Sequence, residues 1–241
     1  MREVSELGTI VGVWAHPDDD IYLTAGLMAA VTGAGQRVVD VTATRGEGGS
    51  MDEERWPPES MGEVRTKELL RSLAVLGVKE HHFLEGPVDL DMDTGLDPAG
   101  AAQVLRIMEE VDPDTVLTFG PEGMTGHAAH KDVSRWAGEA FDRVAKPGAR
   151  LFHAVFPKSL GDAWVERLKP FGIFRPGTPR IVANEELDLE LVLEPALLDR
   201  KIASIKEHAS QIEALYGVFG DEGFKEFMGI ESFVIAATKG A

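Results

Sequence analysis

The sequence has no cysteine among its 241 residues. This absence excludes disulfides, catalysis by a thiolate and zinc fingers that depend on cysteine. A zinc site in this chain would therefore have to use histidine, aspartate and glutamate. The absence does not decide the compartment, because cytosolic and secreted proteins can both lack cysteine.

Basic residues are also few, with 24 lysines and arginines against 41 aspartates and glutamates, which gives a formal net charge of −17. A field of this sign repels the phosphate backbone of nucleic acids and the surface of anionic membranes. We therefore expect neither nucleic acid nor a membrane as a partner. The excess acid is spread along the chain, so most of it favours solubility and a few carboxylates remain for chemistry.

Long hydrophobic runs are lacking too, since no stretch approaches the roughly 20 apolar residues that a transmembrane helix needs. The short apolar run at residues 9–15 follows Glu3 and Glu6, which does not match a signal peptide. These features predict a cytoplasmic protein. The length and the hydrophobic content of 44% suit one large α/β domain with a sizeable core. The oligomeric state stays open, a homo-oligomer included.

Short apolar runs alternate with amphipathic segments over residues 9–156. The runs rich in β-branched residues predict strands at 9–14, 37–44, 81–84, 115–119 and 151–156. Helical spacing of apolar positions predicts helices at 21–31, 63–76, 99–111 and 131–144. This alternating order is typical of a Rossmann-like α/β fold, a mostly parallel sheet with helices on both faces.

The last third of the chain has a different pattern. It predicts one or two short strands within 180–193, a long amphipathic helix at 197–215 and a final strand at 231–238. We interpret residues 157–241 as a smaller α+β extension at the C-terminal end that packs on the core. The sequence thus predicts a single α/β domain over residues 1–241.

Polar segments that could carry chemistry follow the predicted strands directly. They are residues 16–20 after the first strand, 46–49 after the second, 85–93 after the third and 120–130 after the fourth. In open α/β sheets, ligands bind beyond the carboxyl ends of the strands. We therefore expect these segments to form one site.

The first cluster, residues 15–20, reads Ala-His-Pro-Asp-Asp-Asp. Three successive carboxylates repel one another unless a cation compensates them, and Pro17 stiffens the turn that carries them. A neutral imidazole and a carboxylate three residues apart can chelate one metal ion. The remaining carboxylate can then act on a water molecule at that ion.

The second cluster, residues 126–130, contains His127 and His130. Two histidines three residues apart lie on one side of a helical turn, so one could complete a His/Asp/His site while the other faces the substrate. Three N or O ligands with an open fourth position suit catalytic zinc, which lowers the pKa of a bound water from about 15.7 to about 7. With a carboxylate base and a histidine at the oxyanion, these parts hydrolyse an amide or an ester.

Each cluster also has a simpler interpretation when it is taken alone. A His-Pro-Asp segment can be a turn, a His-x-x-His pair is often on a helix surface, and three aspartates often form a solvated loop. Their joint placement at strand ends of one sheet favours the metal site. Arg65 could likewise be an ordinary base on a helix surface, and residues 46–49 could shape the site or form a flexible turn.

At these residues the chain resembles the PIG-L/LmbE-like family of zinc-dependent N-deacetylases. The signature of that family is Ala-His-Pro-Asp-Asp-Glu after the first strand, with a later motif of the type His-Pro-Asp-His. Residues 15–20 and 127–130 match these two motifs. Further matches over residues 9–211 are Thr-Arg-Gly-Glu-Gly at 44–48, the start of a helix at 65–68, Asp-Pro-Asp-Thr-Val at 112–116 and His-Ala-Ser-Gln at 208–211.

The resemblance implies a role for each matching residue. It implies that zinc is held by His16, Asp19 and His130. It also implies Asp18 as the general base and His127 as the acid that stabilises the oxyanion. Arg65 matches a position that contacts the substrate in some members. The implied reaction removes the acetyl group from a small molecule that contains N-acetylglucosamine.

The two motifs each depart from the family pattern. Asp20 stands where the family has glutamate, which is one methylene longer, and Ala128 and Ala129 stand where it has proline and aspartate. That aspartate can orient the first histidine and raise its pKa, so His127 is expected to hold its proton less firmly. Two alternatives remain: a metal-dependent hydrolase of another amide or ester, such as a thiol-conjugate amidase, and a non-catalytic binding protein that contains a metal.

Overall fold

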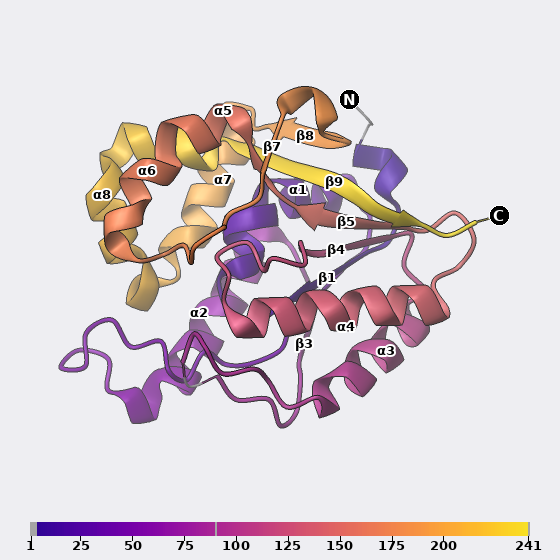
Figure 1. Ribbon diagram of the computed structural model, residues 1–241, viewed down its shortest axis with the longest axis horizontal. Helices are drawn as coiled ribbons and strands as arrows, with labels where there is room; N and C mark the ends of the chain where they lie inside the picture. Colours follow the sequence, from indigo (N-terminus) through magenta and orange to yellow (C-terminus); the bar gives the residue numbers. More distant parts are fainter. Residues whose placement is uncertain (1–3, 90, 241) are drawn as a thin grey trace.

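A seven-stranded sheet forms the centre of the computed structural model, which describes residues 4–89 and 91–240. Its strand order is β3-β2-β1-β4-β5-β9-β8 (Figure 1). The first five of these strands run parallel, and β9 is antiparallel to both β5 and β8. The bounds are β1 Ile10–Trp14, β2 Val38–Thr42, β3 Glu80–Phe83, β4 Thr115–Phe119, β5 Arg150–Ala154, β8 Leu189–Val192 and β9 Ile230–Thr238.

Helices cover both faces of this sheet, as Figure 1 shows for α3 and α4 on the near face. The bounds are α1 Asp19–Gly33, α2 Met61–Leu76, α3 Ala99–Val111, α4 Ala128–Val144 and α7 Pro195–Lys206. Helices α1, α2 and α7 pack against one another on the opposite face. Because β1, β2 and β4 are covered on both sides, every one of their residues is buried. The predicted Rossmann-like, mostly parallel fold is therefore confirmed.

Smaller elements complete the chain. Strands β6 Phe156–Pro157 and β7 Ile181–Val182 pair in a small parallel sheet. The short helical turns are η1 Val4–Leu7, η2 Pro58–Ser60, α5 Lys158–Leu160, η3 Gly161–Val165, α6 Glu166–Leu168, η4 Lys169–Phe171 and η5 Asn184–Glu186. The last helix is α8 Ala209–Met228, which is interrupted at Gly220, where φ is 63°. None of the helices in the described ranges is long and apolar enough to cross a membrane.

The prediction of one helix over 197–215 was wrong, because α7 ends at Lys206 and α8 begins at Ala209. The chain breaks there to satisfy a buried carboxylate. The backbone amide and the hydroxyl of Ser210 both donate to Glu68 on α2, at 2.8 and 2.7 Å. An ionised carboxylate away from water needs such donors, and hydrophobic periodicity cannot reveal them.

The last third shares the central sheet with the rest of the chain, because β9 lies between β5 and β8. We propose on this basis that residues 157–241 belong to the same domain. A buried ion pair reinforces the connection. Lys201 on α7 contacts Glu231 on β9 at 2.8 Å, and both side chains are almost fully buried.

Both members of this pair also form hydrogen bonds with backbone groups of α1. The carboxylate of Glu231 accepts from the amides of Gly26 and Leu27 at 2.7 and 2.8 Å, while the ammonium of Lys201 donates to the carbonyl of Tyr22 at 2.8 Å. Every contact is charge-assisted and shielded from water, so it is stronger than a surface pair. We call this arrangement the Lys201–Glu231 clamp.

Glu231→Ala is expected to destabilise the fold by about 3–5 kcal/mol, because it leaves the ammonium of Lys201 buried and unpaired. Urea denaturation would measure the change in the free energy of unfolding. The exposed pair of Lys225 and Asp199, whose charged atoms lie 3.4 Å apart, provides the control. Asp199→Ala should cost no more than about 1 kcal/mol. Equal losses in both variants would contradict this account of the clamp.

Candidate active site

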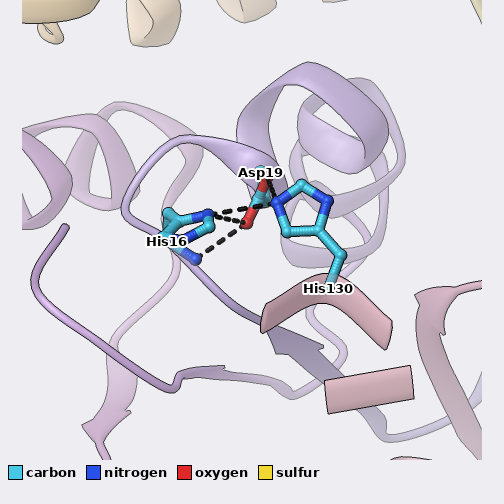
Figure 2. Close-up of side chains that lie close together, drawn as sticks. All are labelled: His16, Asp19 and His130. Atoms are coloured by element: carbon cyan, nitrogen blue, oxygen red, sulfur yellow. Dashed lines mark hydrogen bonds and ion pairs between the residues drawn. The ribbon is translucent and has the colours of Figure 1, made fainter. Parts of the chain in front are cut away.

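Two segments that are distant in sequence, residues 16–19 and the start of α4, bring His16, Asp19 and His130 together at the carboxyl ends of β1 and β4 (Figure 2). His16 follows β1 directly, and Asp19 lies in the first turn of α1. His130 lies in the first turn of α4, beyond the loop that follows β4. The sequence motifs thus meet at the edge of the sheet where ligands of such folds bind.

The ligand atoms of these residues lie within 4.8 Å of one another, and each oxygen of Asp19 is near one of the two histidines. His16 Nδ1 lies 3.1 Å from His130 Nε2 and 3.4 Å from Asp19 Oδ2. His130 Nε2 lies 3.4 Å from Asp19 Oδ1. Metal bonds of about 2.0–2.1 Å place neighbouring ligands of a tetrahedron about 3.3 Å apart. The donor set of two imidazoles and one carboxylate therefore fits zinc in both chemistry and spacing.

The surroundings of His130 leave its Nε2 free to face the other two ligands. Its Nδ1 lies 3.0 Å from the carbonyl oxygen of Gly123, so the proton of the neutral ring belongs on Nδ1. Phe119 stacks on the ring with a centroid distance of 4.2 Å. Burial lowers the pKa of His130 to about 4, which keeps the imidazole neutral and able to bind a metal.

His16 is held between two carboxylates. Burial opposes a charge on its ring, but the contacts with Asp19 and Asp89 outweigh this effect and raise the pKa to about 9. Without a metal, the ring is therefore protonated at neutral pH. Binding of a metal at Nδ1 displaces one proton, so the affinity for the metal must increase with pH.

Asp89, in the loop after β3, is a site residue that the sequence analysis did not single out. Its Oδ2 lies 2.8 Å from His16 Nε2 and 3.7 Å from His127 Nε2. These three residues form a second group of possible metal ligands. The distance of 2.8 Å is shorter than tetrahedral spacing and matches a direct ion pair instead. In the sequence, the one sign that Asp89 belongs to the site is its position in the segment after the third predicted strand.

Asp18 lines the same cavity and is partly buried beside Arg65. Its Oδ2 lies 3.1 Å from Arg65 Nη2. Burial raises the pKa of Asp18 to about 6, and the charge of Arg65 limits the increase. The carboxylate is thus mostly ionised at neutral pH, with a pKa near the working pH of a general base. Asp18 has a φ of 145°, which is a strained conformation for any residue except glycine.

Arg65 also lines the cavity, and both terminal nitrogens of its guanidinium are engaged by the protein. It donates to the carbonyl oxygens of Pro17 at 3.0 Å and Gly46 at 3.2 Å. The glycines of the following loop make this approach possible, since a Cβ at Gly46 would lie 2.1 Å from Arg65 Nη1, and one at Gly49 would lie 2.4 Å from it. The backbone of residues 46–49 therefore packs directly against the guanidinium of Arg65. Contact between Arg65 and a substrate stays a prediction.

The late segment at 208–211 supports the same loop from the other side. Gln211 Nε2 donates to the carbonyl oxygen of Gly49 at 2.9 Å, next to the contact of Ser210 with Glu68. His208 is fully buried, and burial lowers the pKa of its ring to about 3. This segment thus connects α8 to the glycine-rich loop that contacts Arg65.

His127 caps α4 and faces the cavity. Its Nδ1 accepts from the amide of Ala129 at 3.2 Å, so the neutral ring carries its proton on Nε2. Burial and the nearby His16 lower its pKa, and the effect of alanine at position 129 on this proton stays a prediction. Asp89 opposes this effect from the other side. His127 can therefore donate a hydrogen bond from Nε2 without being charged.

Asp20, the second departure from the family motif, points away from solvent and is fully buried. Neither of its carboxylate oxygens has a hydrogen-bond partner within the part of the chain that the structure describes. Burial and the neighbouring Asp40 raise its pKa well above the usual range. The surroundings of this shorter side chain therefore favour its neutral form over the charged one.

Comparisons with known proteins agree with this geometry. The model of the family described as "PIG-L: GlcNAc-PI de-N-acetylase" matches residues 11–141. A 1D-myo-inositol 2-acetamido-2-deoxy-alpha-D-glucopyranoside deacetylase of Thermobispora bispora is 29% identical, over 95% of this chain and 88% of its own.

Solved structures extend the likeness to nearly the whole fold. An N,N'-diacetylchitobiose deacetylase from Pyrococcus horikoshii superposes with a TM-score of 0.66 at 18% identity, covering 96% of this chain and 84% of that chain. A 4-carboxy-2-hydroxymuconate hydratase from Pseudomonas putida reaches 0.59 at 16% identity, covering 92% and 82%. At these identities the superpositions show a shared fold, and one such fold can host more than one reaction.

Proposed function

Because this chain belongs to the GlcNAc-PI de-N-acetylase (PIG-L) family of deacetylases, we propose that it is a zinc-dependent hydrolase that removes the acetyl group from an N-acetylglucosamine-containing small molecule. The relative in Thermobispora bispora is named for such a substrate, in which the amino sugar is joined to inositol. A linear amide is the bond that the proposed reaction breaks.

One observation carries the proposal: two imidazole nitrogens and a carboxylate lie 3.1–3.4 Å apart in a buried cavity, next to the ionisable Asp18. A structural zinc site is closed by four protein ligands, whereas a catalytic site has three and keeps an open position. Among the described residues the ligand group has three members, which are His16, Asp19 and His130. This favours catalysis over a purely structural metal.

In the proposed mechanism, these three ligands would hold a zinc ion, which when bound would supply a Lewis acid for the amide carbonyl and a lower pKa for a water molecule. Asp18 takes the proton from the attacking water, because its carboxylate is ionised and fixed by Arg65. His127 donates from Nε2 to the carbonyl oxygen as negative charge develops there. The proton held by Asp18 is then available to the departing amine.

Asp89 has a positioning role in this scheme, because it lies beside the ring nitrogen of His16 that faces away from the ligand group. A carboxylate in this place fixes the tautomer and orientation of a ligating histidine and increases its basicity. It comes from the loop after β3, and its carbonyl accepts from the amide of Gly48 at 3.0 Å. Two loops therefore hold it in place.

Asp89→Ala is expected to weaken zinc binding about 10- to 100-fold, because His16 loses the partner that orients it. Competition with a chromophoric chelator measures this affinity without any need for turnover. Glu85→Ala, at an exposed position of the same loop, is the matched control and should bind zinc as tightly as the parent. An unchanged affinity in Asp89→Ala would show that this carboxylate does not support the metal.

The experiment that tests the function is a substrate panel with protein of known zinc content. Acetate release is expected from N-acetylglucosamine conjugates, including the inositol conjugate. Turnover confined to other esters, or to amides of thiol conjugates, would favour the first alternative. If fully zinc-loaded protein releases nothing from any member, the proposed reaction is wrong and a binding protein is favoured.

A further inference from the structure

The cavity of the candidate site has a volume of about 590 Å³ and two chemically different ends. The polar end holds the proposed zinc ligands, Asp18 and Arg65. The other end lies among α5, α6, η4, α8 and strand β6, which Figure 1 shows beside the carboxyl ends of the central strands. Its lining is apolar and includes Val155, Pro157, Leu160, Leu168, Leu215 and Met228.

Four phenylalanines form one side of this end, and we call Phe156, Phe171, Phe174 and Phe227 the aromatic wall. The ring of Phe156 contacts Phe174 edge-on and Phe227 at a tilt, with centroid distances of 5.8 Å in both pairs. Phe171 is 55% exposed. Apolar surface left uncovered beside a catalytic centre is typical of a ligand-binding pocket.

The polar side chains near this end are already engaged. The carboxylate of Glu231 is held by Lys201 and by two amides of α1. The amide of Gln211 donates to Gly49. Of the lining residues that the structure describes there, Ser232 keeps a hydroxyl without a partner. A group rich in hydroxyls would lose hydrogen bonds to water on entering this end without replacing them.

We propose that the substrate carries a bulky apolar group next to the scissile amide, an aromatic ring or an alkyl chain of several carbons, and that the aromatic wall binds it. The inference rests on the proposed amide hydrolysis, and it distinguishes this chain's substrate from a conjugate of only sugar and inositol. The apolar group belongs either to the acyl side of the amide or to the glycosidic side of the amino sugar.

Two series of probes separate these sources. One is N-acylglucosamines from acetyl to octanoyl, and the other is alkyl glycosides of N-acetylglucosamine from methyl to octyl. Amine release by the zinc-loaded enzyme gives kcat/KM for each member. In one of the series kcat/KM is expected to increase up to about fourfold per added methylene until the cavity is filled. The series that responds identifies the side of the amide that faces the wall.

Binding is measured separately, so that the inference does not depend on turnover. Calorimetry with an Asp18→Asn variant compares the octanoyl and octyl probes with their acetyl and methyl counterparts. The longer probe is expected to bind at least about 100-fold more tightly in one series. Phe171→Ser should reduce that preference about tenfold. Leu70→Ser, at a residue that is 50% exposed on α2 and outside the cavity, should not change it.

The outcomes are distinguishable. If short N-acetyl probes are hydrolysed but chain length affects neither kcat/KM nor binding, the apolar subsite is wrong and the proposed function stands. If long probes bind tightly and depend on Phe171, but no probe is hydrolysed, the subsite stands and the proposed reaction is wrong. An equal loss of preference in Phe171→Ser and Leu70→Ser would also overturn the role of the aromatic wall.

Discussion

Asp18→Ala is expected to lower kcat by about 10²- to 10⁴-fold, the contribution typical of a positioned general base, while the protein still binds zinc. The reason for the loss is that Asp18 lies next to the ligand group in the cavity without belonging to it, so its carboxylate is free to take a proton. The metal is retained because no ligand atom is removed. Arg65 keeps its contacts with Pro17 and Gly46 and so stays in place.

The measurement combines steady-state kinetics with determination of bound zinc in each variant. Asp18→Asn keeps the shape of the side chain and removes only its basicity, so it should lose nearly as much activity as the alanine variant. Asp142→Ala, at an exposed position on α4, is the matched control and should retain full activity. Full activity in Asp18→Asn would falsify the assignment of the base.

Removal of the metal is expected to reduce activity by about a thousandfold or more, because several kcal/mol of transition-state stabilisation are lost with the Lewis acid. Chelation should be reversible on addition of zinc, since the ligands are held by contacts that do not need the ion. His130 keeps its contact with Gly123, and His16 keeps its contact with Asp89. The assay follows activity together with bound zinc during chelation and reloading.

The same loss should result from His130→Ala, and zinc should not restore it, because one ligand of three is gone. His82→Ala is the control, since His82 is exposed on β3 and lies outside the cavity. Activity that survives in both chelated enzyme and His130→Ala would mean that the reaction does not use this metal site. That result would also remove the main support for amide hydrolysis.

The parallel core of the fold could be predicted from the sequence because each of its strands is a short apolar run between helical segments. The strand predicted at 115–119 has the same bounds as β4, and the helix predicted at 99–111 has the same bounds as α3. His16, Asp19 and His130 could be proposed because their two motifs resemble those of the family. Both motifs also lie beyond the carboxyl ends of parallel strands, which meet at one edge of the sheet.

Contacts between distant loops could not be predicted in the same way. Asp89 carries no motif, and its relation to His16 depends on how the loop after β3 folds back across the sheet. The break between α7 and α8 depends on Glu68, which is 142 residues away from Ser210 in sequence. Periodicity reports which face of an element is apolar, but it contains no information about such partners.

The Lys201–Glu231 clamp has a consequence for the order of events during synthesis. The amide of Gly26 is made early, and the carboxylate that it donates to follows 205 positions later. Until β9 has left the ribosome, α1 lacks the partner built into its backbone, and its first turn carries Asp19. The first turn of α1 therefore gains this support only after β9 has been synthesised, long after His16 and Asp19. We expect the geometry of the candidate metal site to be completed late in folding, when β9 joins the central sheet.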